Sequence, residues 1–381
     1  MSEWRESTWG DEISLEYGKS LRDYNTASGK FRVFGSNGPI GWTTEPLTSG
    51  PGVILGRKGA YRGVEFSRDP FFVIDTAYYV VPKNEFDMRW LYYAIKHHKL
   101  GEIDDGSPIP STTRAAVYVK DMQVPHPKEQ RAIASVLGSL DDKIELNRRM
   151  NETLEALAQS LFKSWFVDAT QSALPKGWRE VPFTETVEIV GGGTPKTSVA
   201  EYWGGDIPWF SVVDSPQGSD LFVIDTEKKI TQAGVENSST QLLSVGTTII
   251  TARGTVGKIA LVGVPMAMNQ SCYGLRGKAG KKGFHTYFVT RALVSQLQQH
   301  AHGSVFDTIT RDTLAGVQVA LPPAAVVEQF EEMVSPLMER IRNNLHESRT
   351  LAALRDALLP KLLSGELRVP AAKLKEDYVS C

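Results

Sequence analysis

Several short segments contain residue types that enzymes use in chemistry, but none has the complete pattern of an active site. The segment GTVGK, residues 254–258, resembles part of a phosphate-binding loop. It is too short for the pattern GxxxxGK[ST], and Ile259 stands where Ser or Thr would be required. GGGT, residues 191–194, lacks both the GxGxxG spacing and a surrounding βαβ pattern. Neither segment therefore predicts a nucleotide site.

Histidine and carboxylate groups are equally incomplete. His97 and His98 are adjacent, and His300 and His302 are two residues apart, but neither pair has a third metal ligand nearby. DSPQ, residues 214–217, lacks the aromatic residue of the DPPY-type loop of amino-methyltransferases. No carboxylate cluster with an ExK segment indicates a nuclease, and no local signature arranges Ser, His and Asp as a triad. We therefore expect no catalytic residue and no metal site on this chain.

Basic residues concentrate in two parts of the chain, although the net charge is only −2. Residues 237–306 contain no Asp or Glu but seven Lys and Arg residues. Residues 24–64 contain one acid, Glu45, and five basic residues. Such local positive surfaces suit phosphate groups. The alternative is that these are strand-rich regions with few charges of either sign.

The chain repeats itself, and this repeat organises everything else. GSPIPSTTR at residues 106–114 returns as GSVFDTITR at 303–311, and EWRES at 3–7 returns as GWREV at 177–181. The offset grows from 174 to 197 residues, so insertions lie early in each half and the later part is rigidly spaced. A period of this length indicates two similar structural units.

A long helix is predicted after the proline-containing segment that ends each globular half. Apolar residues recur there at alternating steps of 3 and 4, which is typical of a coiled-coil seam. In the first half these residues are Ile133, Leu137, Leu140, Ile144, Leu154, Ala158, Leu161 and Trp165. The equivalent seam, 197 residues later, is Phe330, Val334, Leu337, Ile341, Leu351, Arg355, Leu358 and Leu362. Pro336 is expected to bend the second helix or to delay its start.

Polar residues fill two positions of each seam. Asn147 and Asn151 occupy them in the first helix, and Asn344 and Ser348 in the second. If the helices pair antiparallel about a pseudo-twofold axis, Asn147 faces Ser348 and Asn151 faces Asn344. A buried polar layer of this kind costs stability but fixes the register of the two helices. The alternative is that these four side chains are simply exposed.

The pattern predicts an α+β (mixed α/β) fold with a pseudo-twofold internal repeat. Two similar globular domains are separated by two long helices that pair as an antiparallel coiled coil. The expected parts are a first globular domain at 1–125, a central spacer helix and linker at 126–174, a second globular domain at 175–322, a C-terminal spacer helix at 323–370 and a disordered tail at 371–381. Within the domains we expect short helices at 88–99 and 285–300 and strand-like segments at 71–81 and 245–252.

Composition bounds the class of protein. With 381 residues, 41% of them hydrophobic, two or three globular domains are expected. No apolar run reaches the ~20 residues of a membrane span, and the start MSEWREST does not resemble a signal peptide. The two cysteines, Cys272 and Cys381, indicate neither a disulfide framework nor a cysteine zinc site. A cytoplasmic location is therefore expected.

Four segments carry a resemblance to a known family. They are GGGTPK…YWGGDIPWFSVVD at 191–214, ARGTVGKIAL with MNQSCYGL in the middle of the second half, ITRDTLAGVQVALPP at 309–323, and LRDALLPKLLSGEL at 354–367. The first half holds a more diverged version, including YGKSL and FGSNGPIGW. The chain resembles the specificity (S) subunit of type I restriction–modification systems over nearly its whole length.

The resemblance implies a division of labour. Each globular half would be a target recognition domain that reads one half of a bipartite double-stranded DNA site, and the helical spacer would set the gap between the halves. The spacer would also dock two modification (methyltransferase) subunits, and restriction subunits would join the full complex. S-adenosylmethionine, ATP and Mg would bind to those partners, so no cofactor is expected on this chain. The alternatives are a stand-alone two-headed DNA-binding regulator, a protein scaffold and, without support from any methyltransferase motif, a fused enzyme.

Candidate DNA-binding residues follow from the basic loops and turns. In the first half they are Lys30, Arg32, Ser36, Asn37, Arg57, Lys58, Arg62 and Arg114. In the second half they are Thr194, Lys196, Arg253, Lys258 and Arg311. Arginine can read guanine by paired hydrogen bonds, whereas lysine more often contacts phosphate. Arg114 and Arg311 have an alternative as structural residues that tie a strand to its domain, and Trp203, Trp209 and Trp178 are expected in the core.

Overall fold

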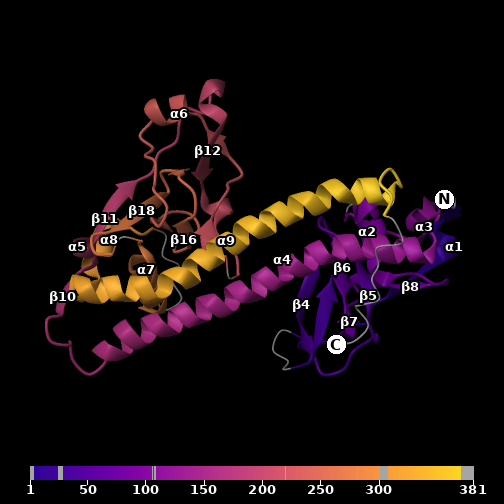
Figure 1. Ribbon diagram of the computed structural model, residues 1–381, viewed down its shortest axis with the longest axis horizontal. Helices are drawn as coiled ribbons and strands as arrows, with labels where there is room; N and C mark the ends of the chain where they lie inside the picture. The colour runs from indigo at the N-terminus through magenta and orange to yellow at the C-terminus, as the bar shows by residue number, and fades with distance from the viewer. Residues whose placement is uncertain are drawn as a thin grey trace. The chain divides into compact units, whose positions relative to one another are not determined.

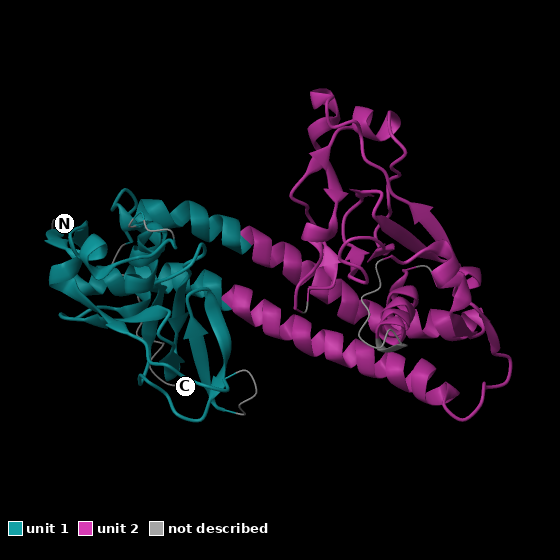
Figure 2. Ribbon diagram, turned by 180° about the vertical axis from the view of Figure 1, so that it is seen from behind, with its two compact units in different colours: residues 1–142, 351–381 teal, residues 143–350 magenta. Residues whose placement is uncertain are grey.

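The computed structural model describes residues 4–24, 29–104, 106, 109–218, 220–280, 282–300 and 308–369. The chain forms two compact units, coloured separately in Figure 2. Unit 1 comprises residues 1–142 and 351–381, and unit 2 comprises residues 143–350. Each long helix therefore contributes to both units. The expected tail at 371–381 lies outside the described residues.

Unit 1 is built on three small sheets. Its antiparallel four-stranded sheet has the order β2 (Ile13–Tyr17), β8 (Ala77–Pro82), β5 (Gly52–Gly56), β6 (Val64–Ser67). Its three-stranded sheet has the order β4 (Gly38–Thr43), β3 (Phe31–Gly35), β7 (Phe71–Val73). A ribbon joins β1 (Arg5–Thr8) to β9 (Asp121–Val124).

Unit 2 repeats this set of sheets with one added strand (Figure 1). Its main sheet has the order β11 (Val187–Gly191), β18 (Cys272–Gly277), β15 (Thr248–Thr251), β16 (Ile259–Val262), β13 (Phe222–Val223). The three-stranded sheet has the order β14 (Lys229–Ile230), β12 (Trp203–Phe210), β17 (Ala267–Met268). The ribbon joins β10 (Arg179–Pro182) to β19 (Gln318–Leu321).

Strand registers show that the duplication extends to single residues. Tyr17 pairs with Tyr78 between β2 and β8, and Gly191 pairs with Tyr273 between β11 and β18. The antiparallel ribbons begin with Arg5 opposite Val124 in unit 1, and with Arg179 opposite Leu321 in unit 2. The predicted α+β repeat is confirmed, and positions in one unit can be compared directly with positions in the other.

Short helices connect the strands, and side-chain caps define where several of them begin. In unit 1 they are α1 (Trp9–Glu12), α2 (Met88–His97) and α3 (Arg114–Tyr118), and in unit 2 they are α5 (Phe183–Thr186), α6 (Gln232–Glu236), α7 (Phe284–His300) and α8 (Arg311–Gly316). Asp87 caps α2 by accepting from the backbone N–H groups of Arg89 and Trp90, a contact typically worth about 1 kcal/mol. The helix was expected to reach residue 99, but it ends at His97 because Lys99 adopts a left-handed conformation with φ of 51°.

One expected strand is two. Residues 71–81 were expected to form one strand-like segment, but β7 ends at Val73 and β8 begins at Ala77. The backbone N–H of Ala77 donates to the carbonyl of Ile74 at 3.1 Å, which closes a turn between them. The two strands belong to different sheets, and Asp75 and Thr76 lie in the turn between them.

The long helices are α4 (Pro127–Phe162) and α9 (Ala324–Leu363), with 36 and 40 residues. In unit 1, Ile133 and Leu137 of α4 enter the same core as Leu362 of α9. In unit 2, Ala158 of α4 packs in one core with Phe330 and other seam residues of α9. The predicted seam positions at the two ends of each helix pair thus enter a core, whereas others, such as Leu140, Ile144 and Leu351, are only half-buried.

Pro336 does not delay the second helix, because α9 begins about three turns earlier, at Ala324. Figure 1 shows α9 changing direction within its first half, the part that contains Pro336. A proline inside a helix removes one backbone hydrogen bond and crowds the preceding turn, so a bend is its expected effect.

One seam position of unit 1 is charged. Arg355 donates to Asp141 across the two helices at 2.6 Å, and the hydroxyl of Tyr93 on α2 donates to the other oxygen of Asp141 at 2.5 Å. The equivalent residues in unit 2 are apolar, since Ala158 and Met338 lie 197 residues from Arg355 and Asp141. The charge is therefore satisfied locally.

Candidate nucleic-acid interface

The two basic loops follow equivalent strands and are closed by the same backbone contacts. In unit 1, Lys58 forms an isolated β-bridge with Ser111, and the backbone N–H of Thr112 donates to the carbonyl of Arg57 at 2.9 Å. In unit 2, Arg253 bridges Thr308 in the same way, and the N–H of Ile309 donates to the carbonyl of Ala252 at 2.9 Å. Residues 111–112 and 308–309 of the repeated segments thus fasten the two basic loops.

Each repeated segment ends with a threonine that caps a helix and an arginine that hydrogen-bonds to a strand. Thr113 caps α3 and Thr310 caps α8 through their side-chain oxygens. Arg114 donates from Nε to the carbonyl of Leu15 on β2 at 2.5 Å, and Arg311 donates from Nη2 to the carbonyl of Ile189 on β11 at 3.2 Å. Both arginines therefore tie the start of a helix to the edge strand of the main sheet, which favours the structural alternative for them.

Arg62 is engaged by the protein itself. Its guanidinium donates to the carbonyls of Gly59, Gly101 and Ile103 and to the hydroxyl of Thr112, at 2.7 to 3.2 Å. These acceptors come from three separate segments, so Arg62 holds the loop in shape. Three of its five N–H groups are thus used within the protein.

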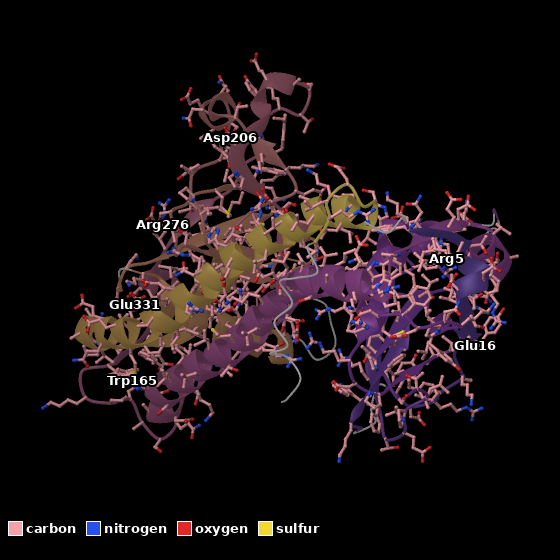
Figure 3. The ribbon with its side chains drawn as sticks, turned by 45° about the vertical axis from the view of Figure 1, so that its right-hand side comes forward. Arg5, Glu16, Trp165, Asp206, Arg276 and Glu331 are labelled. Atoms are coloured by element: carbon pink, nitrogen blue, oxygen red, sulfur yellow. The ribbon has the colours of Figure 1, made fainter. Side chains whose placement is uncertain are left out.

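Arg57 and Arg114 share one aromatic platform. The guanidinium carbons of Arg57 and Arg114 lie 4.9 and 4.3 Å from the ring centre of Tyr17, and each is 5.9 Å from that of Tyr78. Tyr17 is 46% exposed. Burial and the neighbouring Tyr17 hydroxyl raise the pKa of Tyr78 to about 12, so its phenol stays neutral. Glu16, labelled in Figure 3, is the carboxylate at this cluster, 3.4 Å from Arg114.

The hairpin of β3 and β4 carries the other candidates of unit 1. Lys30 and Asn37 are exposed. Arg32 lies opposite Trp42 in the register, with its guanidinium carbon 4.6 Å from the ring centre. Ser36 has a structural role, because its hydroxyl donates to the carbonyl of Thr76 and accepts from the backbone N–H of Lys58 at 3.1 Å.

The candidates of unit 2 are divided in the same way. Arg253, Lys258 and Lys196 are exposed. The Thr194 hydroxyl donates to the side chain of Gln270. Trp209 is buried and donates from its indole N–H to the carbonyl of Gly193 at 3.0 Å, as expected for a core residue.

Residues 237–306, which contain no Asp or Glu, carry less unpaired positive charge in the structure than the sequence suggests, because carboxylates from other segments pair with them. Lys282 pairs with Glu339 at 2.6 Å and Arg291 with Glu155 at 2.5 Å, and both carboxylates come from the long helices. Arg276, labelled in Figure 3, lies 3.7 Å from Glu188 on the adjacent strand. Among the described basic residues of this stretch, Arg253, Lys258 and Lys278 have no carboxylate partner; Lys278 donates to the backbone carbonyl of Thr184, and the other two share one loop.

Aromatic residues at the surface were missed at the sequence level. Tyr61 is 78% exposed on the loop of unit 1 between Lys58 and Arg62, and Tyr17 and Trp42 carry the arginine stacks. Trp42 lies opposite Arg32, a pairing that depends on the register of the β3–β4 hairpin. Tyr17 meets Arg57 only through sheet topology, which no local pattern reveals.

The four polar seam residues come together in unit 2. Asn147 donates from its side-chain amide to the hydroxyl of Ser348 at 3.2 Å and to Glu347 at 2.9 Å. Asn344 donates to the side-chain oxygen of Asn151 at 2.8 Å. The three asparagines are buried, so the alternative of exposed side chains does not hold for them. The two pairs run in opposite chain directions, as an antiparallel contact requires.

Comparison with known proteins gives one family. The sequence matches the family described as Type I restriction modification DNA specificity domain twice, over residues 1–156 and 175–348. The chain belongs to this family.

Relatives and a solved structure agree with the specificity family. The chain is 26% identical over 338 residues to the type I restriction enzyme MjaIX specificity subunit of Methanocaldococcus jannaschii, covering 83% of this chain and 78% of that one. It is 22% identical to the HindI specificity subunit of Haemophilus influenzae, covering 68% and 71%. A crystal structure of the type I restriction–modification S subunit from M. genitalium has the same fold, with a TM-score of 0.65 at 17% identity over 94% of this chain and 96% of that chain.

Two further observations concern membranes and metals. No helix in the described part of this specificity-family chain is both long and apolar enough to cross a membrane. Across the same residues, His, Cys, Asp and Glu side chains form no group of three or more that could hold a metal ion.

Proposed function

We propose that this chain is the DNA-reading subunit of a type I restriction–modification complex, in which each globular half reads one half of a bipartite site. The observation that carries the proposal is the double match to the specificity family, once in each half of the chain. Two similar folds with different surface residues suit a site made of two different half-sequences. Methylation and cleavage are assigned to partner subunits, with S-adenosylmethionine, ATP and Mg bound there.

Exposed cations on the repeated loops are the proposed phosphate contacts. Lys58 in unit 1 and Arg253 in unit 2 occupy equivalent bridge positions, and both are exposed. Lys30, Lys196 and Lys258 are exposed as well. Such contacts release counterions, so binding should weaken steeply with salt, by about one unit of log–log slope for each contact.

The paired helices are the proposed ruler between the half-sites. Helices of 36 and 40 residues are long enough to span more than one 34–36 Å turn of B-DNA. The polar layer formed by the buried Asn147, Asn151 and Asn344 together with Ser348 supports this role, because it disfavours sliding of one helix along the other. A spacer that cannot slide holds a constant gap.

Equivalent exposed leucines are the proposed docking points for two copies of one partner. Leu157 and Leu354 lie 197 residues apart and are 48% and 47% exposed. Leu157 belongs to unit 2 and Leu354 to unit 1, so each unit presents one such leucine. An apolar side chain kept at the surface in both copies of a repeat suits a shared partner. We assign that partner as the modification subunit, with restriction subunits joining the assembled complex.

Co-expression with a candidate modification subunit tests this function. We expect a stable complex with two modification subunits per chain, measured by native mass spectrometry, and salt-dependent binding to duplex DNA. DNA binding without any association would favour a stand-alone two-headed regulator. Association without salt-dependent DNA binding would favour a protein scaffold.

A further inference from the structure

The two units carry different side chains at one position where their backbones make the same hydrogen bonds. Arg57 and Ala252 each follow the central strand of the main sheet, β5 or β15. The N–H of Arg57 donates to the carbonyl of Thr76 at 3.0 Å, and the N–H of Ala252 donates to the carbonyl of Ser271 at 2.7 Å. With the matching carbonyl contacts described above, both residues are fixed in the same backbone frame.

The platform beside this position also exists in only one unit. Tyr17 pairs with Tyr78 in unit 1, whereas the equivalent pair in unit 2 is Gly191 and Tyr273. A side chain at Gly191 would meet no atom within 4 Å, so space is open where unit 1 has a tyrosine ring. Unit 2 therefore lacks both the cation and the ring, although it keeps the surrounding frame.

The residues around this position are shared. Arg114 and Arg311 both hydrogen-bond to the edge strand, and Lys58 and Arg253 form the same bridge as exposed cations. A residue present in both units can make a contact, such as one to phosphate, that every DNA sequence offers. A residue present in one unit alone can serve a contact that only one half-site needs.

The guanidinium of Arg57 is not fully satisfied by the protein. Arg57 is half-buried, and its buried Nε has no acceptor among the described residues, so the terminal Nη1 and Nη2 groups are the donors that a ligand could meet. Its neighbour Arg114 already has partners within the protein, since its Nε donates to the carbonyl of Leu15 and its Nη2 lies near the carboxylate of Glu16. The two guanidinium groups share the Tyr17 ring, but Glu16 pairs with Arg114, and Arg57 has no carboxylate partner among the described residues. Stacking on Tyr17 limits the orientations of the Arg57 side chain.

We propose that Arg57, oriented by the exposed ring of Tyr17, reads a guanine in the half-site bound by unit 1. This inference rests on the proposed function. A planar guanidinium can donate two parallel hydrogen bonds to the O6 and N7 acceptors of guanine, a pairing that separates guanine from the other bases. Unit 2 has no arginine in this frame, so its half-site is read by other side chains.

A phosphate contact is the competing assignment for Arg57. Both phosphate and guanine offer paired acceptors to an arginine fork. The guanine assignment is favoured because a phosphate contact is independent of sequence and would be useful in both units, as at Lys58 and Arg253. An arginine confined to one unit is what different half-sites require.

The test uses the chain assembled with its modification subunits. Methylated adenines are mapped genome-wide for the wild type, Arg57→Lys, Arg57→Ala, Tyr17→Leu and Lys58→Ala, and binding to matched and mismatched duplexes is measured at several salt concentrations. Arg57→Lys keeps the charge but loses the planar fork. We expect it to lose roughly tenfold or more of the discrimination for guanine at one position of one half-site, with the other half-site and the gap unchanged.

Matched variants separate the outcomes. Tyr17→Leu should relax the same position, and Lys58→Ala should weaken binding to all sequences alike while lowering the salt slope by about one. If Arg57→Lys and Arg57→Ala weaken all sequences equally, Arg57 contacts phosphate and the proposal is wrong. Unchanged specificity also overturns it, provided that thermal unfolding and subunit assembly match the wild type. A wild-type complex with no bipartite site would instead refute the proposed function.

Discussion

The side-chain amide of Asn344 on α9 donates to the side-chain oxygen of Asn151 on α4 at 2.8 Å, and both residues are buried. The same layer holds the pair of Asn147 and Ser348, which the repeat relates to the first pair by an offset of 197 residues. A polar layer inside an apolar seam exchanges some stability for a defined register. The gap between the two half-sites would then depend on these hydrogen bonds.

Replacing one asparagine of the pair should lower the free energy of unfolding more than replacing both. Asn344→Leu leaves the buried oxygen of Asn151 without a donor, which should destabilise the chain by about 1–3 kcal/mol. The double variant Asn151→Leu/Asn344→Leu should recover most of this loss, because two apolar side chains then face one another. Chemical denaturation of the four members of the cycle measures the coupling, and strictly additive effects would mean that the pair does not interact.

Histidine at position 285 should make unit 2 sensitive to mild acid. Burial lowers the pKa of His285 to about 4, its Nε2 has no partner among the described residues, and its ring lies 4.6 Å from that of Phe166. The unfolded chain takes up this proton near pH 6.5 while the folded chain resists it until about pH 4. Stability should therefore fall as the pH drops from about 6.5 to 4.

The repeat supplies the control for His285. The residue 197 positions earlier is Met88, so His285→Met copies what unit 1 contains at the start of its own helix. This variant should make the unfolding midpoint less dependent on pH between 6.5 and 4, and its midpoint near pH 8 should stay close to that of the wild type. An unchanged slope in this window would show that His285 is not the group responsible.

Glu12 should dominate the pH dependence of stability below about pH 4.5. Its buried carboxylate accepts from Arg5 and Ser7 at 2.5 Å and from Asn84 at 2.9 Å, and the Arg5 contact is the main cause that lowers its pKa to about 2. Because the folded pKa lies below the ordinary value of 4.5, the stabilisation is full above pH 4.5 and is lost as the pH falls towards 2.

The loss attached to Glu12 is on the order of 3 kcal/mol. Glu12→Gln should remove this part of the acid transition, whereas Glu6→Gln controls for the loss of one exposed carboxylate on β1. Circular dichroism during acid titration gives the comparison. Identical transitions for wild type and Glu12→Gln would contradict the assignment.

Sequence reasoning was most successful where a pattern is local or repeated. The seam residues, the two long helices and the equivalence of the halves follow from spacing alone. The role of Arg62 does not, because three of its acceptors, Gly101, Ile103 and Thr112, lie about 40 to 50 residues away. Similarly, Tyr17 meets Arg57 because β8 pairs with both β2 and β5, which is a fact of sheet order.

Modification subunits should be lost one at a time when the equivalent leucines are changed. Leu157→Asp and Leu354→Asp should each reduce the complex from two modification subunits to one, and the double variant should bind none. Leu146→Asp is the matched control, since Leu146 is also exposed but its equivalent is Asn343. Native mass spectrometry counts the subunits, and full assembly of the double variant would exclude these leucines as docking points.

Lengthening the spacer should change the gap without changing either half-site. Four residues inserted after Asp142 in α4 and four after Thr350 in α9, at the boundary between the units, add about 6 Å, or roughly two base pairs. The methylated site should gain about two unspecified base pairs. If the variant folds and assembles but keeps the original gap, the paired helices are not the ruler.

The most direct test of the account is a map of methylated adenines in cells that carry this chain with its modification subunits, alongside a chimera in which residues 1–125 come from another specificity-family chain. We predict a bipartite, asymmetric site with a fixed gap for the natural chain, and a change in one half-site alone for the chimera. A contiguous site, or a chimera that alters both halves, would contradict the claim that each unit reads its own half of the DNA site.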